Sequence, residues 1–302
     1  MFGVTILGNN SAIPAFDRHP TAQIVTLNDQ CILIDCGEGT QLQLNKYKIK
    51  RSKLNFILIS HLHGDHYFGL VPLISSLGLL GREQDLHLFA PAPLQQIIDL
   101  QLQAANTILP YKLHFHALTE EGVIFLNNKL KISCFKTKHR VDCFGFKIEE
   151  TKPPRKIDKE KVLFYEIPAI FYNQLKEGKD YITKQGEVIK NDVVTIANTS
   201  NRIYAYCADT IYNEDMLPHI ENVNLMYHET TYLRDLEERA AQRFHSTTVQ
   251  AATIAKKANA KSLIIGHFSS KYEYLNEFLE EASTIFEPTQ LATEGTTFRV
   301  LA

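Results

Sequence analysis

The amino-acid sequence predicts a mixed α/β protein whose strands and helices are packed in layers. Two observations support this fold class: short, β-rich apolar runs recur along the chain between turn residues, and helical patterns lie between some of them. The 302 residues are 44% hydrophobic and 22% charged, which is sufficient for a large core. We therefore expect one domain over residues 1–302, with an insertion.

The apolar runs are expected to form strands, because each is rich in β-branched and aromatic residues and ends at turn residues. They are VTILG from Val4, AQIVTL from Ala22, CILID from Cys31, FILIS from Phe56, ISCFKT from Ile132, IYAYCA from Ile203, NLMYH from Asn224 and SLIIG from Ser262.

The clearest helix is expected in TTVQAATIAKKANA, which begins at Thr247. Val249, Ala252 and Ile254 form a partly amphipathic stripe, and either Ser246 or Thr247 provides a side chain suited to the N-cap.

The segment from Thr151 to Val194 differs in composition from the strands on either side of it. It reads TKPPRKIDKEKV and then FYEIPAIFYNQLKEGKDYI, and it is dense in lysine, proline and aromatic residues. We interpret it as an insertion that projects from the core, and the alternative is a plain surface loop with a helix.

The composition limits the cellular setting and the kind of partner. No apolar run approaches the roughly 20 residues that a membrane-spanning helix needs, and MFGVTILGNNSAIP does not resemble a signal peptide. The five cysteines form no C-x-x-C pair and are interpreted as reduced core residues. These features favour a cytoplasmic protein without membrane association. A net charge of −2 means that any nucleic acid would be bound by local basic patches.

Four potential metal ligands lie within six positions, directly after an expected strand. The string FILISHLHGDHYFGL presents His61, His63, Asp65 and His66 where the strand ends. The alternation of His61 and His63 in extended backbone directs both imidazoles to one side, as a shared metal requires. Four chance histidine or aspartate residues at this spacing are improbable, so the string indicates a metal site.

Other expected strands also end in ligand-type residues, namely His139, Asp209 and His267. If these strands are neighbours, the side chains gather along one rim of the sheets. Imidazole and carboxylate ligands without thiolate favour zinc, with manganese or iron possible. We expect two Zn²⁺ ions per chain that share one carboxylate and a nucleophilic water.

The expected ligand sets divide these residues between the two ions. The first ion is assigned His61, His63, His139 and Asp209, and the second is assigned Asp65, His66, Asp209 and His267.

Three residues are candidates for proton transfer. Asp65 is placed beside the expected water and can accept its proton. His245 directly precedes the expected helix, and Glu229 in YHETTY is suited to hold His245 ready to donate a proton to the leaving group. The alternative for this pair is two unrelated polar residues near the rim. His228 is expected to face the opposite side of its strand.

The motifs that contain these residues resemble those of the metallo-β-lactamase superfamily. Within it, the sequence resembles the short-form ribonuclease Z family of tRNA 3′-processing endoribonucleases. The resemblance runs nearly end to end. It rests on LGNNSAIPAFDRHPTAQ, LIDCGEGTQLQL, ISHLHGDHYFGL, KHRVDCFGFKIEE, YAYCADT, YHETTY, FHSTTVQAA and IIGHFSSKY.

The resemblance implies an αβ/βα four-layer sandwich, two zinc ions on its rim, homodimerisation, and an arm after FGFKIEE that holds precursor tRNA. We place this arm at 151–194. Two features depart from the family pattern: the opening turn reads Leu7-Gly8-Asn9-Asn10, and the arm lacks the usual Gly-Pro pair. The implied activity is removal of the 3′ trailer from precursor tRNA, leaving a 3′-hydroxyl on the tRNA and a 5′-phosphate on the trailer.

Two other readings remain open at this point. One is another phosphodiesterase or esterase of the same fold that acts on small substrates, and the other is a non-catalytic RNA-binding subunit.

Basic residues suited to contact RNA form three groups, which lie near the first expected helix, in the inserted segment and beside the expected metal site. They are Lys46, Lys48, Lys50, Arg51 and Lys53, then Lys152, Arg155, Lys156, Lys159 and Lys161, and then Lys136, Lys138 and Arg140. The aromatic residues of the insertion, Phe164, Tyr165, Phe171 and Tyr172, are expected to pack within it rather than to stack on bases.

Overall fold

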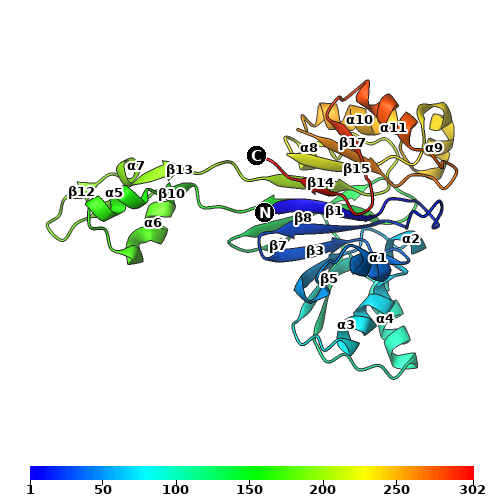
Figure 1. The fold of residues 1–302 in the computed structure, drawn as a ribbon, viewed down its shortest axis with the longest axis horizontal. Helices are drawn as coiled ribbons and strands as arrows, with labels where there is room; N and C mark the ends of the chain where they lie inside the picture. Colours follow the sequence, from blue (N-terminus) through cyan, green and yellow to red (C-terminus); the bar gives the residue numbers. More distant parts are fainter.

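The computed structural model describes residues 1–302 and contains two seven-stranded sheets that pack face to face (Figure 1). The first sheet has the order β18-β1-β2-β3-β4-β5-β6. Its strands are β1 (Phe2–Gly8), β2 (Ala22–Leu27), β3 (Gln30–Ile34), β4 (Leu54–Leu58), β5 (Leu86–Pro91), β6 (Leu113–Leu118) and β18 (Thr297–Arg299). The second sheet has the order β17-β16-β15-β14-β9-β8-β7. Its strands are β7 (Gly122–Leu126), β8 (Leu130–Thr137), β9 (Cys143–Glu150), β14 (Ile203–Cys207), β15 (Leu225–Glu229), β16 (Leu263–Gly266) and β17 (Thr289–Leu291).

Helices cover the outer face of each sheet, which gives the four layers. The first sheet is covered by α1 (Thr40–Lys46), α3 (Leu70–Leu79) and α4 (Pro93–Ala104), with η1 (Arg51–Lys53) before β4. The second sheet carries α8 (Leu217–Ile220), η3 (Arg234–Leu236), α9 (Glu237–Arg243), α10 (Thr248–Lys257) and α11 (Asn276–Ser283). One short helix, α2 (Gly64–Tyr67), follows β4 directly.

Three apolar clusters hold these layers together. The largest has 27 buried residues and lies between the sheets, and the other two lie under the helices. The alternation along β4 shows why the strand reads as a continuous apolar run: Phe56 and Leu58 belong to the central cluster, whereas Ile57 packs under the helices. The eight strands expected from the sequence are all present. The expected helix is α10, and Thr247 rather than Ser246 caps it, through a capping box with Gln250.

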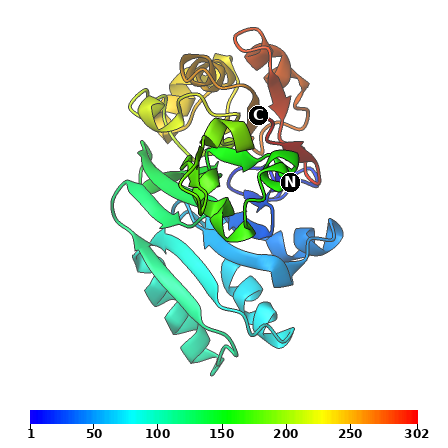
Figure 2. The same cartoon turned by 90° about the vertical axis from the view of Figure 1, so that its left-hand side faces the viewer.

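The segment after β9 projects away from the body as an arm, at the left of Figure 1 and nearest the viewer in Figure 2. It contains β10 (Arg155–Ile157), α5 (Lys159–Phe164), η2 (Ala169–Phe171), α6 (Tyr172–Lys176), β11 (Tyr181–Ile182), β12 (Val188–Ile189), α7 (Asn191–Val194) and β13 (Thr195–Ala197). Its own apolar cluster of five buried residues is separate from the three clusters of the body. Because β13 pairs with β10, the arm ends near residue 197 rather than at Val194, the end expected from composition.

The aromatic residues of the arm do not all pack. Tyr165, Phe171 and Tyr172 contact the apolar cluster of the arm, as expected. The side chain of Phe164 is 77% exposed, so the expectation of packing was wrong for this residue. No helix in the structure combines the length and the apolar character needed to cross a membrane.

Candidate metal centre

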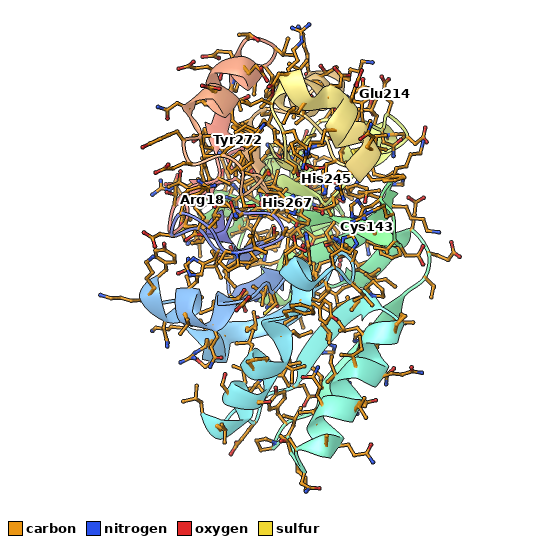
Figure 3. All side chains as sticks on the ribbon, turned by 90° about the vertical axis from the view of Figure 1, so that its right-hand side faces the viewer. Arg18, Cys143, Glu214, His245, His267 and Tyr272 are labelled. Carbon is orange, nitrogen blue, oxygen red and sulfur yellow. The ribbon has the colours of Figure 1, made fainter.

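The candidate ligands lie together because the strands that carry them end at the same rim of the sandwich. β14, β15 and β16 are parallel neighbours, and Asp209, Glu229 and His267 lie at or just beyond their carboxyl ends. β4 in the opposite sheet ends just before His61, and β8 ends just before His139. Figure 3 shows His245 and His267 between the two halves of the molecule. Residues far apart in sequence thus reach one site, as is common at strand ends in α/β proteins.

The first group brings together His61, His63, His139 and Asp209, whose candidate ligand atoms lie within 4.8 Å of one another. His63 Nδ1 lies 2.9 Å from His61 Nε2 and 3.0 Å from His139 Nε2. One ring nitrogen cannot satisfy both neighbours with a single proton. The separations are near the spacing of about 3.3 Å between ligand atoms of a tetrahedral zinc ion with bonds of about 2.0–2.1 Å.

The second group contains Asp65, His66 and His267, again within 4.8 Å. His66 Nε2 and His267 Nε2 lie 3.3 Å apart, and His267 Nε2 lies 3.4 Å from Asp65 Oδ2. The Asp65 carboxylate also accepts a 2.7 Å hydrogen bond from the backbone N–H of Ala12, which fixes its orientation.

Asp209 lies between the two groups. Its Oδ2 is 3.7 Å from His61 Nε2 and 3.5 Å from His66 Nε2. Its Oδ1 is buried and accepts no hydrogen bond, and it faces the His267 Nε2 at 3.3 Å. A buried carboxylate oxygen without a donor fits a metal ligand, because burial of an unpaired charge is otherwise costly. The seven residues expected as ligands therefore lie in two groups on either side of Asp209, and a third group of Asp209, His245 and His267 overlaps them.

The ring nitrogens that face away from the site are held by neighbouring groups, a common arrangement for metal-binding histidines. The pairs are His61 Nδ1 with Ser60 Oγ at 3.0 Å, His66 Nδ1 with Asp35 Oδ2 at 2.8 Å, His139 Nδ1 with the Phe244 carbonyl at 2.9 Å, and His267 Nδ1 with Thr231 Oγ1 at 3.0 Å. These contacts orient the four opposite nitrogens toward one another.

The protonation of the first group also suits metal binding, which requires neutral imidazole. Burial lowers the pKa of His61 well below its ordinary value and lowers that of His63 to about 4. The pKa of His139 is lowered for the same reason. Burial would raise the pKa of the Asp65 carboxyl, but His66 and His267 outweigh it and lower this pKa. Near pH 7 the three histidines of the first group are thus neutral and Asp65 is ionised, and these residues fit a divalent ion.

The expected pair of His245 and Glu229 is formed, with His245 Nδ1 3.2 Å from Glu229 Oε1. Burial opposes protonation of His245, but the Glu229 carboxylate outweighs it and raises the pKa of His245. Glu229 is fully buried and also accepts a 2.7 Å hydrogen bond from the backbone N–H of Ser246. His228 is buried and forms no hydrogen bond with a side chain of either metal group. Its Nδ1 faces the Glu229 carbonyl at 2.6 Å.

A cavity of about 440 Å³ opens over the two groups. Arg140, Arg239 and Arg243 line it together with His63, Asp65, Asp209, His245 and His267. Sequence reasoning found Arg140 but missed Arg239 and Arg243, which lie on and at the end of α9. Guanidinium groups beside a metal centre suit an anionic substrate such as a phosphodiester.

Asp35 is the other residue that sequence reasoning missed. Its Oδ2 accepts a 2.6 Å hydrogen bond from the Tyr206 hydroxyl and faces His66, and its Oδ1 accepts one of 2.7 Å from the Ser60 N–H. The signal was present, because Asp35 directly follows the CILI strand, as the other site residues follow theirs.

Comparisons with known proteins identify the family. The chain is 42% identical over 296 residues to a ribonuclease Z of Bacteroides thetaiotaomicron, covering 97% of this chain and 94% of that protein. The chain belongs to the ribonuclease Z family. Membership makes it a metal-dependent endoribonuclease, and the His/Asp groups at the rim indicate divalent metal binding.

Solved structures show that the ribonuclease Z chain has the metallo-β-lactamase fold. The human tRNase Z short form superposes with a TM-score of 0.73 at 23% identity, covering 99% of this chain and 100% of that one. The metallo-β-lactamase fold protein YhfI from Bacillus subtilis gives 0.70 at 20% identity, with 98% of each chain covered. A family model described as anti-Pycsar protein Apyc1 also matches residues 2–166. The four-layer fold expected from the sequence is therefore confirmed.

Proposed function

We propose that the protein removes the 3′ trailer from precursor tRNA, leaving a 3′-hydroxyl on the tRNA and a 5′-phosphate on the trailer. The observation that carries this proposal is the near full-length similarity to proteins named ribonuclease Z, combined with a cavity where a His/Asp cluster and arginines meet. We assign two Zn²⁺ ions per chain, with Mn²⁺ or Fe²⁺ as substitutes, because the donors are imidazole and carboxylate without thiolate.

Divalent ions held by the two groups would supply Lewis-acid chemistry, which would lower the pKa of water and stabilise negative charge on the phosphate. Asp65 is oriented by Ala12 at the mouth of the second group, so it is placed to accept the proton of the attacking water. His245 lies beside Asp209, with Nδ1 3.9 Å from Asp209 Oδ2, and is held by Glu229, so it is placed to donate a proton to the leaving 3′-oxygen.

The arm is proposed to hold the body of the tRNA. Lys156, Lys159 and Lys161 are exposed on it and free to meet phosphates, whereas Lys152 bonds to Glu150 and Arg155 bonds to Thr195. Phe164, three residues after Lys161, has an exposed ring. The arm thus combines cations with an aromatic side chain, although its Gly-Pro pair is missing.

A homodimer located in the cytoplasm is also proposed, and it rests on family membership. Light scattering of the purified chain tests the dimer, and a monomer at micromolar concentration would contradict it.

Removal of the arm tests the RNA assignment. The chain enters and leaves the arm at Pro154 and Asn198, where the Asn198 N–H donates to the Pro154 carbonyl at 2.9 Å. Joining these two residues therefore removes 155–197 with little displacement of the body. We expect hydrolysis of bis(p-nitrophenyl) phosphate to persist while cleavage of end-labelled precursor tRNA collapses. Equal loss or equal retention of the two activities would refute the role of the arm.

A second candidate is a phosphodiesterase or esterase that acts on small substrates, favoured by the position of the metal groups and their cavity, which include no residue of the arm. It needs the same metal groups but not the arm. A wild-type protein that hydrolyses small phosphodiesters and leaves precursor tRNA intact would support it. A third reading, a non-catalytic RNA-binding subunit, predicts fewer than about one metal ion per chain and no effect of a chelator on RNA. The complete donor set argues against that reading.

A further inference from the structure

A second cavity of about 440 Å³ lies beside the metal centre, between the β8–β9 connection and the end of α9. We call it the basic pocket, and the residues that matter for it are Lys136, Lys138, Arg140, Val141, Ile211 and Phe244. Arg140 lines both the basic pocket and the cavity over the metal groups, and the candidate ligand His139 also lines the basic pocket. A nucleic-acid strand bound at the metal centre therefore has a direct path into the basic pocket.

The basic pocket carries a surplus of positive charge. Lys136 and Arg140 form no ion pair within the chain, and Asp142 is the acidic residue in the lining. Lys138 pairs with Asp215, but both side chains are exposed, at 58% and 76%. An exposed pair of this kind contributes little stability, so a phosphate can replace the Asp215 carboxylate at small cost. The charge suits a polyanion.

Phe244 gives the basic pocket an aromatic surface. Its side chain remains 39% exposed although it lines the cavity. Its backbone has φ 60°, the left-handed region where α9 ends. Glycine or asparagine makes this turn at lower cost, since a large side chain is disfavoured there. The same turn directs the Phe244 carbonyl to His139 Nδ1, so the exposed ring lies next to the metal centre.

We propose that the basic pocket binds the nucleotide next to the scissile phosphodiester, with the base stacked on the Phe244 ring and its phosphate paired with Arg140 and Lys138. Aromatic rings combined with cations are the usual means of holding single-stranded nucleic acid. The inference rests on the proposed RNA substrate. Two sources have this chemistry, the first trailer nucleotide and the last nucleotide of the tRNA.

The test compares wild type with Phe244→Ala, Phe244→Tyr and the matched control Tyr274→Ala, an aromatic residue that is 79% exposed. Loss of one stacked base costs about 1–3 kcal/mol, so we expect kcat/KM on precursor tRNA to fall roughly 5- to 150-fold in Phe244→Ala. The loss on precursor tRNA should exceed any loss in turnover of bis(p-nitrophenyl) phosphate by at least fivefold, and zinc content should be retained because the substitution keeps the backbone carbonyl that holds His139. Phe244→Tyr should retain wild-type activity on RNA, as should the control.

Substrates with one abasic nucleotide distinguish the two sources. If the trailer base stacks on Phe244, its removal should abolish the further effect of Phe244→Ala, and removal of the last tRNA base should not. The reverse result assigns the pocket to the tRNA end. The inference is overturned if Phe244→Ala lowers kcat/KM on both abasic substrates as much as on intact precursor tRNA. It is also overturned if turnover of bis(p-nitrophenyl) phosphate falls by the same factor as RNA cleavage. Equal RNA cleavage by wild type and Phe244→Ala overturns the inference alone. A wild-type protein inactive on precursor tRNA overturns the proposed function and the inference together.

Discussion

Replacement of Asp35 by asparagine tests how the fold supports the metal centre. The carboxylate accepts hydrogen bonds from Tyr206 and Ser60 and faces His66 Nδ1 at 2.8 Å. The amide of asparagine has nearly the same shape, but its NH₂ group places a donor against one of these donors. His66 then loses the partner that directs its other nitrogen toward Asp209. Loss of such a partner lowers metal affinity by about 10- to 100-fold, or about 1.4–2.7 kcal/mol.

The two metal groups should respond differently to Asp35→Asn. The second group contains His66, which contacts Asp35 directly, whereas in the first group His61 reaches Asp35 only through the Ser60 hydroxyl. Titration of the metal-free protein with Zn²⁺ against a competing indicator should therefore show one strongly weakened event and one less affected event. Tyr206→Phe removes one donor to Asp35 and should have a smaller effect in the same direction. Equal weakening of both events, or of neither, would refute the assignment of Asp35 to the second group.

Four further predictions concern catalysis, stability and metal. His245→Ala should lower kcat on RNA by about 10²- to 10⁴-fold at unchanged zinc content, and a loss of zinc would contradict its role as proton donor. Burial would raise the pKa of Glu150, but bonds from Arg202 and Lys152 lower it to about 2 from 4.5. The stabilisation from Glu150 should thus be complete above about pH 4.5 and be lost as the pH falls toward 2, and acid unfolding of Glu150→Gln should show a shallower pH dependence. Gly69→Ala should destabilise the body by about 3 kcal/mol, since its Cβ would lie 2.2 Å from the Gly37 carbonyl oxygen, and urea titration measures this. Removal of zinc held at 1,000 times its Kd should cost about 4 kcal/mol of stability, and calorimetry with and without a chelator should show a lower Tm.

The strand ends explain how much of the site the sequence could predict. An apolar strand followed by a histidine or aspartate can be recognised by eye, and the parallel order of β14, β15 and β16 then brings Asp209 and His267 together. Arg239 and Arg243 follow no strand. They reach the site because α9 packs at the rim, and nothing in the local pattern distinguishes them from other exposed arginines.

The sequence could not predict the backbone groups that hold the site residues either. The Phe244 carbonyl holds His139 and the Ala12 N–H holds Asp65, and any residue type offers these groups. Their placement depends on left-handed backbone at Phe244 and Ala12, with φ 60° and 61°. Neither residue type favours that region, so propensity argues against both turns. The end of the arm was expected at about Val194, and the last three residues could not be assigned to it because the short strand β13 is defined by its pairing with β10.

The buried negative charge of the site explains why the fold requires a metal ion there. Asp35, Asp209 and Glu229 are buried, and Asp65 is nearly so, yet no lysine or arginine is buried among them. Unpaired buried carboxylates are strongly unfavourable. The Asp209 carboxylate, followed by Asp65 and Asp35, raises the pKa of His66 well above its ordinary value although burial opposes this, which shows the demand for positive charge at this point. Divalent ions meet the same demand while leaving the imidazoles neutral. The residues that make the rim reactive are therefore also those that make it dependent on metal, whereas the exposed arginines around the cavity remain available to the substrate.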